Sequence, residues 1–133
     1  MSGRIGAGYG GFFWRAPASS TNVRVFAADA EGAESLNGRL APWIALTGVS
    51  AAGQDWSLIF MAVRAEHDPW FVRTRDYPGI GSSLAARAAL EIPPDGSVHR
   101  RIDTIVADGL RPPPEAAALV EAVLVEAAAE RAP

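Results

Sequence analysis

The sequence predicts a mainly β protein: an antiparallel β-sandwich followed by one C-terminal amphipathic α-helix. Up to residue 111, short segments rich in β-branched and aromatic residues alternate with turns rich in glycine and proline. After three consecutive prolines, the period of the apolar residues changes from two to 3.6. Many short strands followed by one helix are typical of a sandwich, so we predict a β-sandwich module at 1–111 and a helix packed on it at 112–133.

About seven strands are expected, four of them in the first half of the module. The aromatic run at 10–15 is too short for a stable helix. Residues 23–27 alternate β-branched with larger residues and lead into a polar loop, and a third strand follows at 43–47. Residues 56–63 are nearly all apolar, which predicts a central strand buried on both faces.

The second half of the module has weaker signals. A strand is expected at 70–73, followed by a turn-rich segment at 76–81. Residues 83–92 favour helix by propensity but lead into a Pro-Pro-Asp-Gly turn, so we assign their second half to a strand. The last strand spans 98–106, and its polar pattern indicates partial exposure.

The helix begins where the prolines end. Pro114 suits the first helical position and Glu115 lies in the first turn. This pattern is typical of an amphipathic helix that covers an apolar sheet face, and a partner-binding tail is the alternative. The apolar stripe consists of Ala116, Leu119, Val120, Val123, Leu124 and Ala127.

The composition is that of one ordinary domain. The chain has 133 residues, of which 49% are hydrophobic and 20% charged, and the absence of cysteine excludes disulfides and cysteine-ligated zinc. A net charge of −3 makes nucleic acid an unexpected partner. The longest apolar run, at 58–63, is too short to span a membrane, and the first twenty residues lack the apolar core of a signal peptide. We therefore expect a cytoplasmic protein without membrane contact.

A glycine-rich opening raises the possibility of nucleotide binding. Residues 6–11 satisfy G-x-G-x-x-G, and Asp29 stands near the distance of a ribose-binding acid. Only five residues precede Gly6, however, and an aromatic strand follows where a dinucleotide-binding fold requires a helix. We interpret these glycines as allowing close approach of aromatic rings and backbone at the start of a strand.

The candidates for acid–base catalysis are few. His67 stands between Glu66 and Asp68, an arrangement that suits proton transfer near neutral pH, although a polar loop entering Pro69 explains the same residues. His67 and Glu66 are the weak catalytic candidates. The only other histidine is His99, and no metal-ligand spacing is present, so neither a metal nor another cofactor is expected.

Aromatic residues are the candidates for ligand binding. The chain has four tryptophans and two tyrosines, most of which are expected in the core. An exposed ring flanked by arginines and carboxylates is suited to hold the apolar face and the hydroxyls of a sugar. The candidate ligand-binding residues are Trp43, Asp68, Trp70, Arg73 and Tyr77.

Three motifs together resemble an uncharacterised bacterial family that is labelled methane oxygenase A-like. They are GYGGFFWRAP at 8–17, APWIAL at 41–46, and DPWFVR at 68–73 with YPGIG at 77–81. The resemblance extends from about residue 4 to residue 109 and corresponds to the C-terminal part of that family. It implies half of a large sandwich like that of galactose mutarotases, with a saccharide or sugar acid as ligand. Two histidines and no cysteine do not supply the ligands that a copper enzyme needs, so methane oxidation is not expected.

A half-sandwich leaves an apolar sheet face to cover. Residues such as Ile44, Leu46, Ile59 or Met61 would lie on that face, and we expect the C-terminal helix to cover it. The hypotheses for function are a carbohydrate-related binding or processing module, a structural half-domain that completes its sandwich with a partner chain or as a homodimer, and a sugar epimerase or lyase that uses His67. Enzymatic activity and the identity of the ligand stay open.

Overall fold

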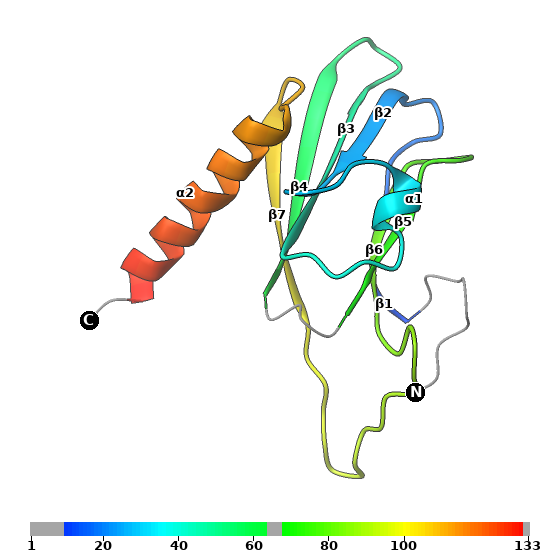
Figure 1. Ribbon diagram of the computed structural model, residues 1–133, viewed down its shortest axis with the longest axis vertical. Helices are drawn as coiled ribbons and strands as arrows, with labels where there is room; N and C mark the ends of the chain where they lie inside the picture. The colour runs from blue at the N-terminus through cyan, green and yellow to red at the C-terminus, as the bar shows by residue number, and fades with distance from the viewer. Residues whose placement is uncertain (1–9, 64–67, 132–133) are drawn as a thin grey trace.

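The computed structural model describes residues 10–63 and 68–131 and has two antiparallel sheets packed face to face with a C-terminal helix beside them (Figure 1). The three-stranded sheet has the order β1-β6-β5, and the four-stranded sheet has the order β2-β3-β4-β7. These observations confirm the predicted fold class. The strands are β1 (Gly11–Arg15), β2 (Thr21–Phe26), β3 (Trp43–Val49), β4 (Asp55–Val63), β5 (Trp70–Arg73), β6 (Gly79–Ser83) and β7 (Arg101–Asp108).

The main core lies between the two sheets. Alternate residues of each strand point toward the opposite sheet, so the apolar half of each strand is removed from water. Phe60 of β4 is at its centre and is fully buried; its ring lies 5.8 Å from the rings of both Phe12 and Trp14 on β1. The other buried members of this core are Val25, Ala27, Leu36, Ile44, Leu46, Leu58, Trp70, Val72 and Ile80.

A second core covers the opposite face of the four-stranded sheet. Helix α2 (Pro113–Arg131) places Ala116 and Val120 against that face. The sheet contributes Phe26, Trp43, Ala45, Ile59 and Met61 to the same core. Strands β3 and β4 are therefore buried on both faces, and the prediction of a doubly buried strand at 56–63 is confirmed.

The helix does not cover all the residues that the sequence suggested. Ile59 and Met61 face α2, but Ile44 and Leu46 belong to the core between the sheets. The reason is register: Ile44 is paired with Phe60, and Ala45 is paired with Ile59, so Ile44 and Ile59 point to opposite sides. The two sheet faces are thus covered by different elements.

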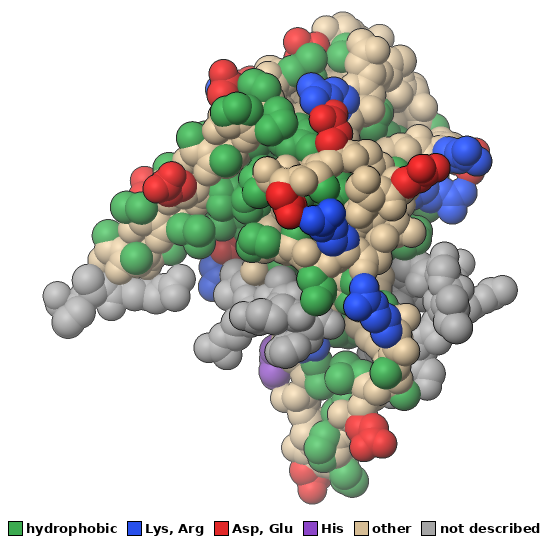
Figure 2. Space-filling view, in the orientation of Figure 1, with side chains coloured by type: hydrophobic (Ala, Val, Ile, Leu, Met, Phe, Trp, Pro, Cys, Tyr) green, Lys and Arg blue, Asp and Glu red, His purple; other side chains and the backbone are tan. Residues whose placement is uncertain are grey.

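Only the N-terminal half of α2 packs closely on the sheet. Figure 1 shows the helix diverging from the sandwich toward its C-terminal end, and Figure 2 shows hydrophobic side chains along its visible surface. Leu124 and Val125 are 55% and 63% exposed. The placement of Leu124 in the buried stripe was therefore wrong, because the axis of the helix leaves the sheet before that residue.

Strand β6 lies where a turn was expected, and the strand assigned to the second half of 83–92 is absent. Residues 79–83 contain two glycines, but these leave room for the ring of Phe13 on the neighbouring strand. A Cβ atom at Gly81 would lie 3.0 Å from that ring, and one at Gly79 would lie 3.1 Å from it. The aromatic ring thus covers a strand that has little intrinsic β propensity.

Two further boundaries differ from the expectation. The last strand begins at Arg101 instead of residue 98. A four-residue helix, α1 (Ala33–Leu36), occurs within the expected polar loop, and its Leu36 is fully buried in the main core. Burial of one leucine anchors a segment whose sequence otherwise resembles a loop.

Candidate functional site

The two tryptophans of the predicted ligand-binding set are core residues. Trp43 is 6% exposed and packs edge-on against Phe26 beneath helix α2, with ring centroids 6.3 Å apart. Trp70 is 1% exposed between the sheets, and its indole N–H donates to the carbonyl of Ala41 at 2.9 Å. The four-stranded sheet separates the two rings, so they do not form one binding surface.

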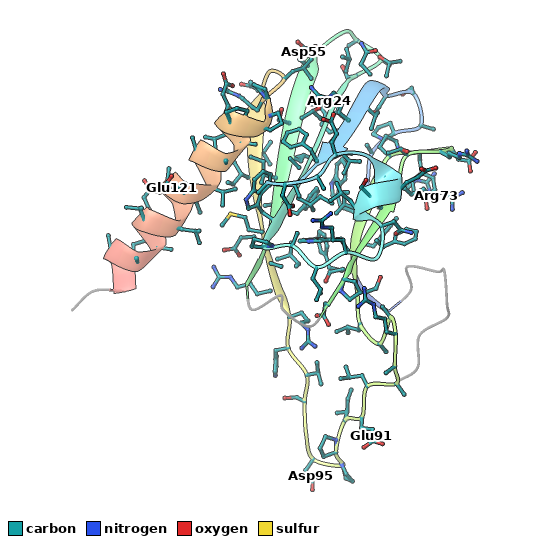
Figure 3. All side chains as sticks on the ribbon, viewed as in Figure 1. Arg24, Asp55, Arg73, Glu91, Asp95 and Glu121 are labelled. Carbon is teal, nitrogen blue, oxygen red and sulfur yellow. The ribbon has the colours of Figure 1, made fainter. Side chains whose placement is uncertain are left out.

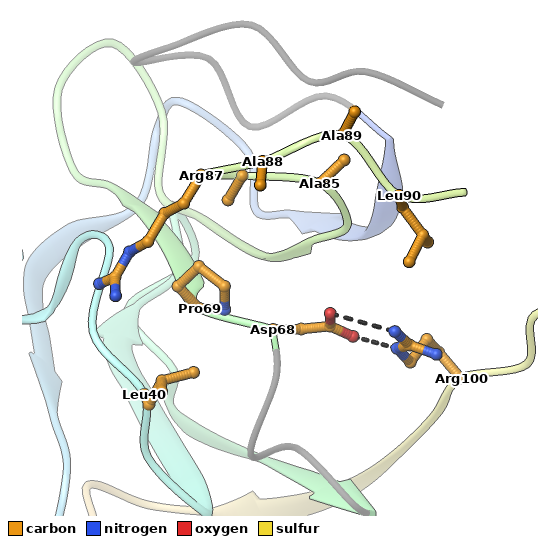
Figure 4. A pocket seen from close by; sticks show the side chains of 10 residues that line it. Leu40, Asp68, Pro69, Ala85, Arg87, Ala88, Ala89, Leu90 and Arg100 are labelled. Atoms are coloured by element: carbon orange, nitrogen blue, oxygen red, sulfur yellow. Dashed lines mark hydrogen bonds and ion pairs between the residues drawn. The ribbon is translucent and has the colours of Figure 1, made fainter.

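Asp68 lies in a different place, at the wall of a small pocket. Its carboxylate is buried and accepts two hydrogen bonds from Arg100, from Nε and, at 3.3 Å, from Nη2 (Figure 4). The pocket has a volume of about 270 Å³. Its remaining lining comes from Leu40, Pro69 and residues 85–90. Both oxygens of Asp68 are thus engaged within the protein, which is the arrangement of a structural ion pair.

Arg100→Ala is expected to lower the free energy of unfolding by about 2 kcal/mol, because it leaves the carboxylate of Asp68 buried without its partner. The arginine is 31% exposed, which keeps the loss below that of a fully buried pair. Chemical denaturation measures the loss. Arg101→Ala is the matched control, since Arg101 is 72% exposed in its pair with Asp103, and identical denaturation midpoints for the two variants would contradict the structural role of Arg100.

Arg73 and Tyr77, the other two predicted residues, do lie together. The guanidinium carbon of Arg73 is 5.0 Å from the centroid of the Tyr77 ring, and that of Arg15 on β1 is 4.2 Å from the same centroid. Register explains the meeting: Arg15 and Arg73 are both paired with Gly79 of β6, one from each side. Figure 3 shows Arg73 beside the β5–β6 turn, on the side of the molecule away from α2.

Two phenylalanines extend this surface along the same strands. Phe13 and Phe71 flank Gly81 of β6, and their rings lie 6.0 Å apart. Phe13 also meets Tyr77 edge-on at 6.3 Å and is 43% exposed. We call the five residues Phe13, Arg15, Phe71, Arg73 and Tyr77 the arginine–tyrosine face. It is the outer face of the three-stranded sheet.

The arginine–tyrosine face carries more positive than negative charge. Arg73 donates to Asp76 at 2.6 Å, and this hydrogen bond raises the pKa of Arg73 above its ordinary value. Arg15 forms no ion pair with any described residue. Basic side chains gather at the right edge of the molecule in Figure 2, where Figure 1 places the β5–β6 turn. In a chain of net charge −3, this is a local excess of positive charge, the electrostatic character that attracts an anion.

The sequence contains a signal for this face that no single motif reveals. Phe13-Trp14-Arg15 and Phe71-Val72-Arg73 have the same Phe-x-Arg pattern. In a strand, the first and third residues of such a pattern point to one side. Two Phe-x-Arg strands, one on each side of a glycine-rich strand, therefore predict an exposed aromatic and cationic surface.

The catalytic candidates are not placed on this face. Glu66 and His67 lie outside the described residues. His99 is exposed in the segment before β7, where its imidazole shares a hydrogen bond of 2.8 Å with Ser97. Within residues 10–63 and 68–131, no three acidic or histidine side chains are arranged to hold a metal ion. The epimerase or lyase hypothesis therefore stays a prediction from the sequence.

Comparisons with known proteins give a family without a function. Neither helix in the described part of the chain has the length and apolar character needed to cross a membrane. No curated protein matches the chain, and no solved structure matches it. A family model does match, over residues 3–121, which include every strand and the first half of α2. The chain therefore belongs to DUF6807, a family of unknown function.

Proposed function

We propose that this protein binds an acidic saccharide, such as a uronic acid or another sugar acid, on the arginine–tyrosine face. The observation that carries the proposal is the convergence of two guanidinium groups on one tyrosine ring, at 4.2 and 5.0 Å from its centroid. Contact with the ring holds each guanidinium plane in position, which lowers the entropy lost when a ligand binds.

The chemistry of the face suits a sugar carboxylate. Arg15 has no carboxylate partner among the described residues, so its N–H groups are available for a bidentate hydrogen bond with a carboxylate. Asp76, held by Arg73, supplies an acceptor for sugar hydroxyls. The exposed part of Phe13 supplies an apolar surface for the C–H groups of a sugar ring. The ligand thus meets charge, hydrogen bonds and apolar surface on one side of the sheet.

The motifs that resemble the methane oxygenase A-like family support the same location. The motif at 8–17 contributes Phe13 and Arg15, and the motifs at 68–73 and 77–81 contribute Phe71, Arg73 and Tyr77. Segments far apart in the chain thus place their exposed residues on one face. The saccharide class comes from the mutarotase-like relationship that the resemblance implies, and its acidity comes from the arginines.

The experiment is a glycan array followed by calorimetric titration of the retained sugars. We expect retention of glycans that carry a carboxylate and little retention of their neutral counterparts. Arg15→Ala is expected to weaken binding roughly 10- to 100-fold, since a hydrogen bond to a charged group contributes about 1.5–3 kcal/mol. The affinity should also fall as salt concentration rises.

Arg87→Ala is the matched control, because Arg87 lines the pocket beside Asp68 instead of the arginine–tyrosine face and donates to the carbonyl of Gly38. Equal affinity for carboxylated and neutral sugars would contradict the role of the arginines. An array without retained glycans, or the same affinity for the wild type and Arg15→Ala, would contradict the proposal as a whole.

A further inference from the structure

The two sheets of the sandwich differ in width by one strand. β1, the edge of the three-stranded sheet, lies over β4: Phe12 contacts Phe60, and Trp14 contacts Trp56 at a centroid distance of 6.1 Å. The four-stranded sheet continues past β4 to β7. Val106 of β7 is paired with Leu58 and shares its inward-facing side, yet Val106 is 78% exposed. No described strand covers β7 on that side.

The opposite side of the sandwich is closed by a segment that has no counterpart beside β1 within residues 10–63 and 68–131. There, residues 37–39 run along the outer edge of β5 and satisfy its backbone groups. The N–H of Gly38 donates to the carbonyl of Trp70 at 2.7 Å, and the N–H of Trp70 donates to the carbonyl of Arg39 at 2.9 Å. The side-chain oxygen of Asn37 accepts from the N–H of Val72 at 3.0 Å.

The free edge of β1 lacks such partners among the described residues. Towards β6, the N–H of Ala16 donates to the carbonyl of Pro78, and the carbonyl of Gly10 accepts from the N–H of Leu84, at 2.8 Å each. Because backbone direction alternates along a strand, Phe13 and Arg15 direct their N–H and C=O groups to the other edge. β1 also contains none of the prolines or inward-pointing charges that normally protect an edge strand.

Two cavities lie on the side of the sandwich between β1 and β7, and the larger of the two has a mainly apolar wall. One cavity of about 450 Å³ lies between Trp14 on one sheet and Trp56, Leu58 and Val106 on the other. A second, of about 330 Å³, lies between Phe12 and Ile102. Both cavities are lined by residues of β1 and of β7 or its approach, so both lie on the same side of the sandwich, and the larger one also reaches the loops at 16–20 and 50–52.

We propose that this open side binds an extended strand of a separate polypeptide, which pairs with the free edge of β1 and lies over the inward face of β7. The backbone groups of Phe13 and Arg15 specify the class of partner, because a row of alternating donors and acceptors is matched by another strand. The difference of one strand between the sheets sets the width of the slot at about 4.8 Å. Val106 and Trp56 determine which side chains fit: the residues of the incoming strand that face them, which are every second residue, are apolar.

A second copy of this chain is a poor fit to the slot. In an antiparallel pair formed through two β1 strands, each four-stranded sheet would extend one strand beyond its own β1. The β7 strand of one copy would then occupy the space of β4 in the other, because β4 lies beneath β1. A single strand from another polypeptide enters without this collision.

The test selects a phage-displayed library of random peptides, each longer than the five residues of β1, on the full chain. Enriched peptides are expected to have apolar residues at alternate positions. Val106→Asp should weaken their binding about tenfold or more in calorimetry, because it places a charge in the floor of the slot. Val125→Asp is the matched control, since Val125 is an exposed valine on α2. N-methylation of alternate peptide amides should abolish binding, because it removes the donors that pair with β1.

Three results would overturn the proposal. The first is a selection on the wild-type chain that enriches only peptides that are also enriched on the Val106→Asp chain. The second is selected peptides that bind Val106→Asp and wild type equally. The third is a dimeric mass in light scattering that becomes monomeric in Val106→Asp but not in Val125→Asp, which would make the occupant a second copy. Val106 belongs to the other sheet from the arginine–tyrosine face, so these results are separate from those of the saccharide test.

Discussion

Replacing Phe60 with alanine is expected to lower the free energy of unfolding by about 3–5 kcal/mol, more than the loss expected for Arg100→Ala. Phe60 is fully buried on β4, and its ring joins the two sheets through contacts with Phe12 and Trp14. Truncation of this side chain removes buried apolar area and the aromatic contacts. It also leaves a cavity, which the two sheets are unable to close because their hydrogen bonds hold the strands in place. The melting temperature should fall by about 10–20 °C.

The control for this prediction is Val106→Ala, which removes apolar atoms from the same sheet at a position that is 78% exposed. We expect a change within about 0.5 kcal/mol there. Differential scanning calorimetry measures both variants. If Phe60→Ala melted within about 2 °C of the wild type, the main core would not lie between the sheets as described.

Deletion of residues 112–133 is expected to expose the second core and to cause association or aggregation. Trp43, Ile59 and Met61 are at most 6% exposed beneath α2, and their exposure would create a contiguous apolar patch on the four-stranded sheet. Light scattering and binding of a hydrophobic dye measure the change. A truncated chain with unchanged mass per particle and unchanged melting temperature would show that the helix does not cover this face.

A point substitution tests the same contact in the full-length chain. Val120→Asp places a charge where α2 meets the sheet, at a side chain that is 6% exposed. We expect it to increase dye binding and lower the melting temperature, as the deletion does. Val125→Asp introduces the same charge into the same helix at a position that is 63% exposed, and it should change neither quantity.

Much of the fold follows from local pattern. The strands at 11–15, 21–26, 43–49, 55–63 and 70–73 and the helix at 113–131 lie where period-two and period-3.6 patterns predict them. β6 does not, because its stability depends on Phe13, a residue far away from Gly79 in the chain, and glycine has no local preference for a strand. Residues 84–92 show the reverse: alanines that favour helix locally form no helix or strand.

The candidate site follows from local pattern less completely. Arg73 and Tyr77 were predicted and do meet, whereas Trp43 and Trp70 were predicted with them and are separated by a sheet. All four occur in segments of similar composition. Their difference lies in which face of a strand each occupies and in what covers that face, and for β3 both faces are covered.

The sequence by itself determined which residues alternate along each strand, where glycine and proline end the strands, and where a helical period begins, because these depend on the geometry of neighbouring residues. Only the tertiary structure decided that Arg15 and Arg73 meet over one tyrosine, that helix and sheet cover opposite faces of β4, and that no strand of the described residues covers the inward face of β7. Those outcomes depend on register and on sheet width, and both are set by contacts between segments far apart in the chain.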